Sequence, residues 1–272
     1  MLSYRYFNAQ EIIAKDELPA GPWFHTDDTE MAISIVNVLK SHGNIHQEAL
    51  VKRFARRFDR DPDRGYGSMT RIQMRELIAG AKWKDNAAKA FSGQGSMGNG
   101  GAMRAAPLGA YFADNLGQCV SEARASSEVT HTHPEGIAGT IAVALAAALA
   151  WQLKDLPPNE RPVRFFEEIL RLAPESEVRR KILIASQTPP EVPVEETAKA
   201  LGNGSLVTAP DTVPFCLWMA AHHLNDFKKA LAQTISGGGD CDTNAAIVCG
   251  IVALSAGRHQ IPVEWLNSRE KI

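Results

Sequence analysis

The chain has 272 residues, 44% of them hydrophobic, and its 29 Lys and Arg against 31 Asp and Glu give a formal net charge of -2. This length suits one large domain or two small ones, and the hydrophobic fraction excludes wholesale disorder. The balanced charge argues against a nucleic-acid binder held by phosphate attraction and against a polybasic membrane surface. We therefore expect a globular protein with neither nucleic acid nor membrane as a partner.

The cysteines and the N-terminal residues indicate in which cellular compartment the protein is expected. The four cysteines, Cys119, Cys216, Cys241 and Cys249, form no Cys-x-x-Cys pair, and this long chain does not read as a disulfide scaffold. Residues 1–17 have neither the basic region nor the apolar region of a secretory signal. We expect a cytoplasmic protein.

Helical periodicity dominates from residue 28 onward. Residues 28–41 place Ile35 and Leu39 on one apolar face, and Gly43 follows as a stop signal. Residues 47–60 interleave Phe54 and Phe58 with five basic residues. This spacing resembles a nucleic-acid patch, but at neutral overall charge it favours a core face with a solvated basic side.

The same periodicity predicts further helices at residues 70–82, 118–128, 136–153, 164–172, 226–235 and 242–256. Residues 136–153 approach the length of a membrane span, but their alanine-rich composition favours a helix buried within the protein. Proline-rich stretches at 157–162 and 187–193 are typical of loops between helices. Because no segment shows sustained strand alternation, the predicted fold is all-α, in one domain.

An acidic motif, His25–Glu30 (HTDDTE), directly precedes the first amphipathic helix. Asp27 followed by Glu30 has the spacing of a capping box, so one interpretation is only a well-capped helix. A helix start also favours carboxylates through its dipole and its free N–H groups.

A second acidic motif, GGGDCDTN at residues 237–244, opens the last long helix. Its glycines allow a loop of positive φ that passes close to another group, and Asp240 and Asp242 point to one side if the loop is extended. If the two helix starts converge, four carboxylates share one site, and two divalent cations would neutralise them. An oxygen-only ligand set favours Mg²⁺ or Mn²⁺ over zinc, and a metal pair activates water.

A glycine-rich loop, residues 92–104, lies between the two motifs. Its exposed N–H groups would form an anion cradle, although a flexible connector is the alternative. It is neither a Walker A loop nor a Rossmann fingerprint. His131 is a plausible hydrogen-bonding partner for a polar ligand, whereas His133, just before Pro134, is interpreted as structural.

Six segments in chain order resemble the ADP-ribosylglycohydrolase family. They are HTDDTE (25–30), RGYGSMT (64–70), GSMGNGGAMRAAP (95–107), THTHPEG (130–136), GNGSLVTAPDTVPFCLWM (202–219) and GGGDCDTNAAIVCGIVAL (237–254). The resemblance covers nearly the whole chain. It implies one compact domain over residues 1–272, a multi-helix orthogonal bundle with a binuclear Mg²⁺ or Mn²⁺ centre.

The resemblance also assigns roles to residues. The implied metal ligands are Thr26, Asp27, Asp28, Asp240, Asp242 and Thr243, with Asp242 as the bridge. The implied ADP-ribose-binding residues are Ser96, Met97, Gly98, Asn99, Gly100, Gly101 and His131. Asp28 is the candidate catalytic residue, which steers the attacking water.

The implied reaction is hydrolysis at the anomeric carbon of ADP-ribose, through an oxocarbenium-like state. The implied partner is an ADP-ribosylated protein or a small ADP-ribosyl compound, and the acceptor is left open between arginine, serine and a small molecule. We expect a monomer or a small homo-oligomer.

Two features depart from the family pattern. Members usually carry an N-terminal Gly-Asp-Ala-x-Gly segment and a catalytic Glu, and residues 1–11 join the pattern after that segment. We therefore expect the family's N-terminal helix to be missing, which motivates the alternative of a catalytically impaired ADP-ribose-binding relative. Glu11 and Glu17 are interpreted as solvated surface charges. Cys241 replaces the usual Thr, and its thiol is expected to soften the metal preference or to make the centre sensitive to oxidation.

Overall fold

The structure, a computed structural model, describes residues 20–272. Within that range the regular elements are helices, and β-pairing is limited to the isolated bridges Trp23–Arg269 and Gly98–Thr208. The predicted all-α class is confirmed. Glu11, Glu17 and the expectation of a missing N-terminal helix lie outside the described residues.

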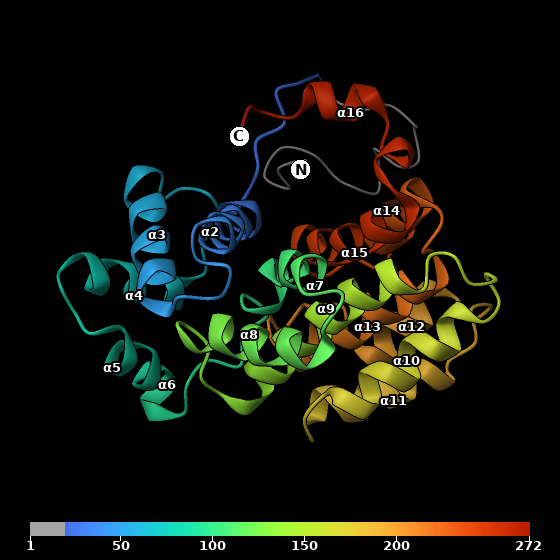
Figure 1. The fold of residues 1–272 in the computed structure, drawn as a ribbon, viewed down its shortest axis with the longest axis horizontal. Helices are drawn as coiled ribbons and strands as arrows, with labels where there is room; N and C mark the ends of the chain where they lie inside the picture. The colour runs from blue at the N-terminus through green and yellow to red at the C-terminus, as the bar shows by residue number, and fades with distance from the viewer. Residues whose placement is uncertain (1–19) are drawn as a thin grey trace.

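Helix α9, Pro134–Gln152, occupies the centre of the fold (Figure 1). Pro134 suits the first helical turn, and His133 Nδ1 accepts a hydrogen bond from the Glu135 N–H at 3.1 Å, as its predicted structural role requires. The helix is apolar on every side and long enough to cross a bilayer, but 83% of its most apolar window is buried inside the protein. The prediction of a buried core helix is confirmed.

The helices that surround α9 come from distant parts of the chain. They are α7 (Ala106–Tyr111), α8 (Leu116–Glu128), α10 (Arg161–Leu172), α11 (Glu177–Gln187), α13 (Ala209–His222) and α15 (Cys241–Ala256). To one side, at the left of Figure 1, lie α2 (Asp27–His42), α3 (Gln47–Arg60), α4 (Ser68–Ile78), α5 (Trp83–Ala88) and α6 (Ala90–Gly93). The remaining elements are η1 (Ala102–Arg104), α12 (Val194–Leu201), α14 (Phe227–Ser236), η2 (Arg258–Gln260) and α16 (Val263–Ser268).

Most predicted helices are confirmed within one to three residues. Helix α2 ends where expected, because Gly43 takes a left-handed φ of 74° and its N–H bonds to the Leu39 carbonyl. Helix α4 ends at Ile78, four residues before the predicted end at 82, since the chain turns at Gly80 with φ 94°. Helix α13 was not predicted, because it contains Pro214.

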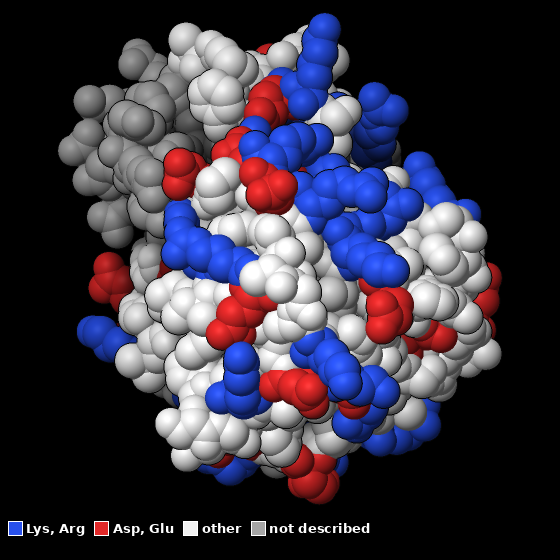
Figure 2. Space-filling view, turned by 90° about the vertical axis from the view of Figure 1, so that its left-hand side faces the viewer, with Lys and Arg blue, Asp and Glu red and all other residues white. Residues whose placement is uncertain are grey.

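The basic segment of α3 has the predicted two-sided character. Phe54 and Phe58 are 2% and 3% exposed, so this face of the helix belongs to the core. The opposite side carries Lys52, Arg56 and Arg60 in solvent. Figure 2 shows Lys and Arg gathered on the face of the molecule that carries α3, α4 and α5. The interpretation of a core face with a solvated basic side is confirmed.

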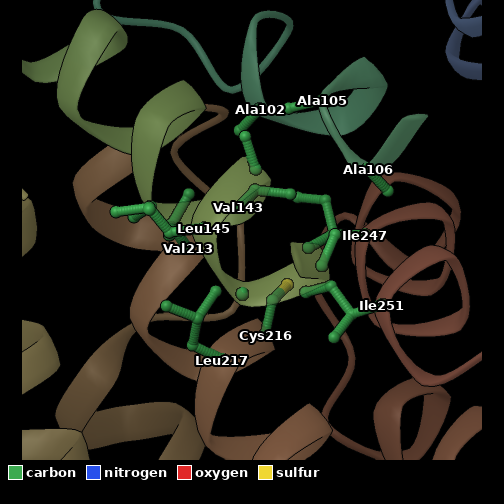
Figure 3. Close-up of a cluster of buried hydrophobic side chains, with 14 of the residues drawn as sticks. Ala102, Ala105, Ala106, Val143, Leu145, Val213, Cys216, Leu217, Ile247 and Ile251 are labelled. Carbon is green, nitrogen blue, oxygen red and sulfur yellow. The ribbon is translucent and has the colours of Figure 1, made fainter. Parts of the chain in front are cut away.

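Small residues let the central helices approach closely. Figure 3 shows side chains from η1, α7, α9, α13 and α15 meeting in one cluster, with alanines 102, 105 and 106 on one side and Ile247 and Ile251 on another. Gly109 of α7 is the tightest contact with α9: a Cβ there would lie 2.1 Å from the Ala144 carbonyl oxygen. This backbone contact brings the helix that follows the glycine-rich loop against the centre of the fold.

Gly109→Ala is therefore expected to destabilise the protein by about 1–3 kcal/mol, because neither backbone can move without displacing its helix. Thermal unfolding followed by circular dichroism measures the effect. Gly117→Ala is the matched control, since a Cβ there meets only Asn115 Oδ1 at 3.5 Å, an ordinary contact. This control should retain or slightly raise the midpoint, and equal midpoints for the two variants would contradict the packing argument.

Candidate active site

The start of α2 forms the first half of the site. Thr26 is the N-cap residue, and its hydroxyl donates to Asp28 Oδ2 at 2.5 Å. The Asp27 N–H donates to the Arg64 carbonyl at 2.8 Å, which holds this turn against the chain after α3. Asp28 is 2% exposed, and its Oδ1 is buried without a hydrogen-bond partner among residues 20–272. An oxygen in that position calls for a cation or a ligand donor.

The capping-box interpretation of this turn is wrong. Glu30 does not reach back to the helix start; its carboxylate is fully buried and accepts hydrogen bonds from His25 Nε2 at 2.8 Å and from Arg57 Nε. Burial alone would raise the pKa of Glu30, but these two donors lower it below its ordinary value. Tertiary pairing thus outweighs the local cap.

The start of α15 forms the second half. Gly239 has φ 70°, and a Cβ there would lie 2.1 Å from the Asn203 carbonyl oxygen, so the loop passes where only glycine fits. The Asp240 N–H donates to that same carbonyl at 3.1 Å. Cys241 points its thiol toward the Ile235 carbonyl at 3.8 Å, and burial together with nearby carboxylates raises its pKa, which disfavours a reactive thiolate.

The two helix starts meet, which is the condition on which the metal-site hypothesis depends. Burial raises the pKa of Asp27 to about 8, and the negative charges of Asp28, Asp242 and Asp240 add to the shift. Burial likewise raises the pKa of Asp242 to about 8, with Asp28 and Asp240 contributing. Carboxylates shift one another's pKa values in this way only at short range, so all four lie in one cluster, in which Asp28 is buried and the other three are half-buried.

Asp28 differs from the other carboxylates. Burial raises its pKa to only about 6, because hydrogen bonds from Thr26 and Thr243 favour the ionised form. Thr243 is 6% exposed at the first turn of α15 and reaches across to the carboxylate of α2. The two threonine hydroxyls therefore converge on Asp28, one from each helix start.

The donor chemistry of this cluster fits divalent cations. All six predicted ligands are oxygen donors, and Asp28 Oδ1 has no partner in the described chain. Asp240 lies close enough to Asp242 to raise the pKa of that carboxyl. Within residues 20–272, no three His, Cys, Asp or Glu side chains are arranged to hold a metal ion. Cation binding would therefore draw these carboxylates together and would recruit the threonine hydroxyls.

The predicted ligand loop lies against the second acidic motif. Asn99 is 4% exposed, and its Nδ2 donates to Asp240 Oδ2 at 2.7 Å. A Cβ at Gly100 would lie 2.9 Å from the His131 ring, and one at Gly101 would lie 2.4 Å from Thr140 Oγ1. Met97 remains 37% exposed at the rim. The loop is packed on both sides, which does not fit a free connector.

The structure places the remaining loop residues in the same segment. Ser96 is 5% exposed, and its Oγ accepts the Gly98 N–H at 3.2 Å. His131 is 5% exposed and packs on the loop from the segment between α8 and α9. The structure therefore brings together the metal-ligand candidates and the ligand-loop candidates, joined directly by Asn99 and Asp240.

A buried ion network behind α2 was not predicted from the sequence. Glu30 pairs with Arg57 and Arg60 of α3, and it is joined through His25 to Glu270 near the C-terminus. Glu270 also accepts a hydrogen bond from Arg64. These contacts clamp the turn that carries Asp27 and Asp28. The one sequence feature that could have indicated this network is Glu30, a charged residue next to the apolar positions of α2.

Glu30→Ala is expected to cost about 1.5–3 kcal/mol of stability, because it leaves the half-buried Arg57 without its carboxylate and removes one of the two carboxylates that pair with His25. Thermal unfolding with and without salt would measure the loss. Glu177→Ala, which removes an exposed partner of Arg180, serves as the control and should leave the midpoint unchanged. A Glu30→Ala midpoint equal to that of the control would show that the network does not stabilise the fold.

Comparisons with known proteins give a family match over nearly the whole chain. Residues 2–271 match a family model described as ADP-ribosylglycohydrolase. The human protein named ADP-ribosylhydrolase ARH3 is 30% identical over 277 residues, which cover 91% of this chain and 75% of that protein. An uncharacterized protein of Archaeoglobus fulgidus is 31% identical over 253 residues, covering 92% and 76%.

A solved structure titled "ADP-ribosylglycohydrolase-related protein complex" has the same fold. Its TM-score is 0.66 at 24% sequence identity, over 93% of this chain and 78% of that one.

Proposed function

The chain belongs to the ADP-ribosylglycohydrolase family, and from this premise we propose that it is a metal-dependent hydrolase that releases ADP-ribose from a modified side chain or a small acceptor. The alternative acceptors are arginine, serine and a small molecule. One observation carries the proposal: four carboxylates from two helix starts, Asp28 buried and the other three half-buried, lie beside a glycine loop, and Asn99 joins the two parts.

Thr26, Asp27, Asp28, Asp240, Asp242 and Thr243 would hold two divalent cations, Mg²⁺ or Mn²⁺. When bound, the cations supply Lewis acidity that orients ribose oxygens and makes a water molecule more nucleophilic. The raised pKa values of Asp27 and Asp242 support this assignment, because a cluster of carboxylates that retains protons near neutral pH is one that a cation pair would ionise.

The chain's own groups would perform the remaining work. The loop from Ser96 to Gly101 would bind the diphosphate through its N–H groups and place the anomeric carbon beside the acidic cluster. There the carboxylates would stabilise the positive charge of an oxocarbenium-like transition state.

Asp28 would orient the water through Oδ1, which has no other partner within residues 20–272. As the water oxygen bonds to the anomeric carbon, the glycosidic bond breaks and its electron pair leaves with the acceptor. The acceptor gains the proton that the water loses.

The test is an assay of ADP-ribose release. The full chain is incubated with Mg²⁺ or Mn²⁺ and with arginine-linked peptides, serine-linked peptides or a small ADP-ribosyl compound. Release that depends on the added cation is expected for at least one linkage. No release beside an active control enzyme would contradict the proposal, and ADP-ribose binding by calorimetry without turnover would identify a binding protein instead.

A further inference from the structure

We propose that Arg104 and Thr130 are positioning residues that fix His131 as a neutral imidazole protonated on Nε2, which donates a hydrogen bond to an oxygen atom of ADP-ribose. The identity of the ligand rests on the proposed function, whereas the position of the proton follows from the protein's own hydrogen bonds.

Arg104 begins the chain of contacts. It ends η1, directly after the glycine loop, and is fully buried. Its Nη2 donates to Thr130 Oγ1 at 2.8 Å and to the Ser126 carbonyl at 2.9 Å. The guanidinium also lies over the Phe54 ring, 4.6 Å from its centroid. Because a guanidinium has donors and no acceptor, the Thr130 oxygen must accept this hydrogen bond.

The hydrogen bond from Arg104 also determines how the Thr130 hydroxyl bonds to His131. Thr130 Oγ1 lies 2.7 Å from His131 Nδ1, and Thr130 is 1% exposed. In the described chain, no other acceptor lies within reach of the hydroxyl proton. If Nδ1 carried a proton, the hydroxyl proton would be buried without a partner, at a cost of about 1–3 kcal/mol. The hydroxyl therefore donates to Nδ1, and a neutral ring then carries its proton on Nε2.

The surroundings of the ring favour its neutral form. Burial, and then the nearby charge of Arg104, lower the pKa of His131 to about 3. The backbone also fixes the ring's position, since the His131 N–H donates to the Ser127 carbonyl at 2.8 Å. His131 is thus held in one tautomer and one place.

The Nε2 edge of the ring faces the glycine loop. A Cβ at Gly100 would lie 3.1 Å from Nε2, and one at Gly98 would lie 3.2 Å from it. No group within residues 20–272 forms a hydrogen bond with this nitrogen. A neutral N–H beside the loop can donate to a bound ligand, and the diphosphate and ribose of ADP-ribose offer oxygen acceptors. His131 would therefore orient the ligand through one hydrogen bond, without adding a positive charge.

The proton position is directly measurable. The full chain is labelled with ¹⁵N-histidine, and long-range ¹H–¹⁵N correlation at pH 7 distinguishes a protonated ring nitrogen from a bare one. His131→Gln assigns the signals by removing one set. We expect His131 to show a bare Nδ1 and a protonated Nε2. A proton on Nδ1, or a doubly protonated ring, would overturn the proposal.

Variants test the role of Thr130. Thr130→Val removes the hydroxyl at nearly constant volume and should let the proton distribute over both ring nitrogens, whereas Thr130→Ser should retain the native pattern. Ser126→Ala is the matched control, because it removes a buried hydroxyl that has no partner in the described chain. A native spectrum for Thr130→Val would overturn the proposal. If that variant does not fold, the wild-type and Thr130→Ser spectra decide.

Added ADP-ribose tests the ligand contact. Saturation should shift the His131 Nε2–H signal in the wild type and in Ser126→Ala, and Thr130→Val should bind about fivefold more weakly, the loss of one net hydrogen bond. An unchanged Nε2–H signal while calorimetry shows saturation would overturn the contact. If ADP-ribose does not bind at all, the proposed function fails, and the spectrum of the free protein still decides the tautomer.

Discussion

Replacing Asp242 with asparagine is expected to lower kcat/KM for ADP-ribose release by about a hundredfold to a thousandfold, the loss typical of one charged stabilising group at a reacting centre. The same change should raise the thermal midpoint of the metal-free protein. Asp242 is half-buried beside Asp28 and Asp240, so its ionisation opposes folding when no cation is present. Asparagine keeps the shape and removes that charge.

Opposite changes in activity and stability distinguish this account from simple misfolding. Activity is measured as ADP-ribose release with saturating Mn²⁺, and stability is measured by thermal unfolding in chelator. Asp114→Asn, an exposed carboxylate remote from the cluster in sequence, should change neither quantity. A metal-free Asp242→Asn protein that unfolds at a lower temperature than the wild type would argue against a repulsive cluster.

Metal and pH are expected to act together on stability. Asp27 and Asp242 have folded pKa values of about 8 against ordinary values of 3.8. Between about pH 4 and pH 8, the folded metal-free protein therefore holds protons that the unfolded chain has released, and its free energy of unfolding falls as the pH rises. Cations bind the ionised carboxylates, so their stabilising effect should grow across the same range.

Thermal unfolding at pH 5, 6.5 and 8, with chelator or with Mn²⁺, measures both trends. At a concentration a hundredfold above its Kd, Mn²⁺ should add about 2.7 kcal/mol. Chelation should abolish ADP-ribose release, and added Mn²⁺ should restore it. A metal-free midpoint that rises between pH 6.5 and pH 8, or an Mn²⁺ shift that is equal at these two pH values, would contradict the assignment.

The helices were predictable where local pattern and tertiary structure agree. Helix α3 begins and ends at the predicted residues, since its buried Phe54 and Phe58 repeat at helical spacing. Helix α13 was hidden because Pro214 interrupts the sequence signal, whereas the packing of its buried side chains stabilises the helix in the fold.

The site was predictable in its parts, and its assembly came from the fold. The two acidic motifs and the glycine loop are visible in the sequence as residue types, but the hydrogen bond from Asn99 to Asp240 spans 141 positions. The burial of Arg104 could not be predicted from the sequence, because charged side chains are normally exposed. Glu30 was misread as a cap, since its partners come from α3 and from the segment before α2.

The most direct test of the account is the anomalous scattering of Mn²⁺ in a crystal of the full chain grown with Mn²⁺ and ADP-ribose. We expect two Mn²⁺ peaks between the carboxylates of Asp27 and Asp28 and those of Asp240 and Asp242, with the diphosphate against residues 96–101. The account would be contradicted by Mn²⁺ bound elsewhere, or by no Mn²⁺ at all between these carboxylates.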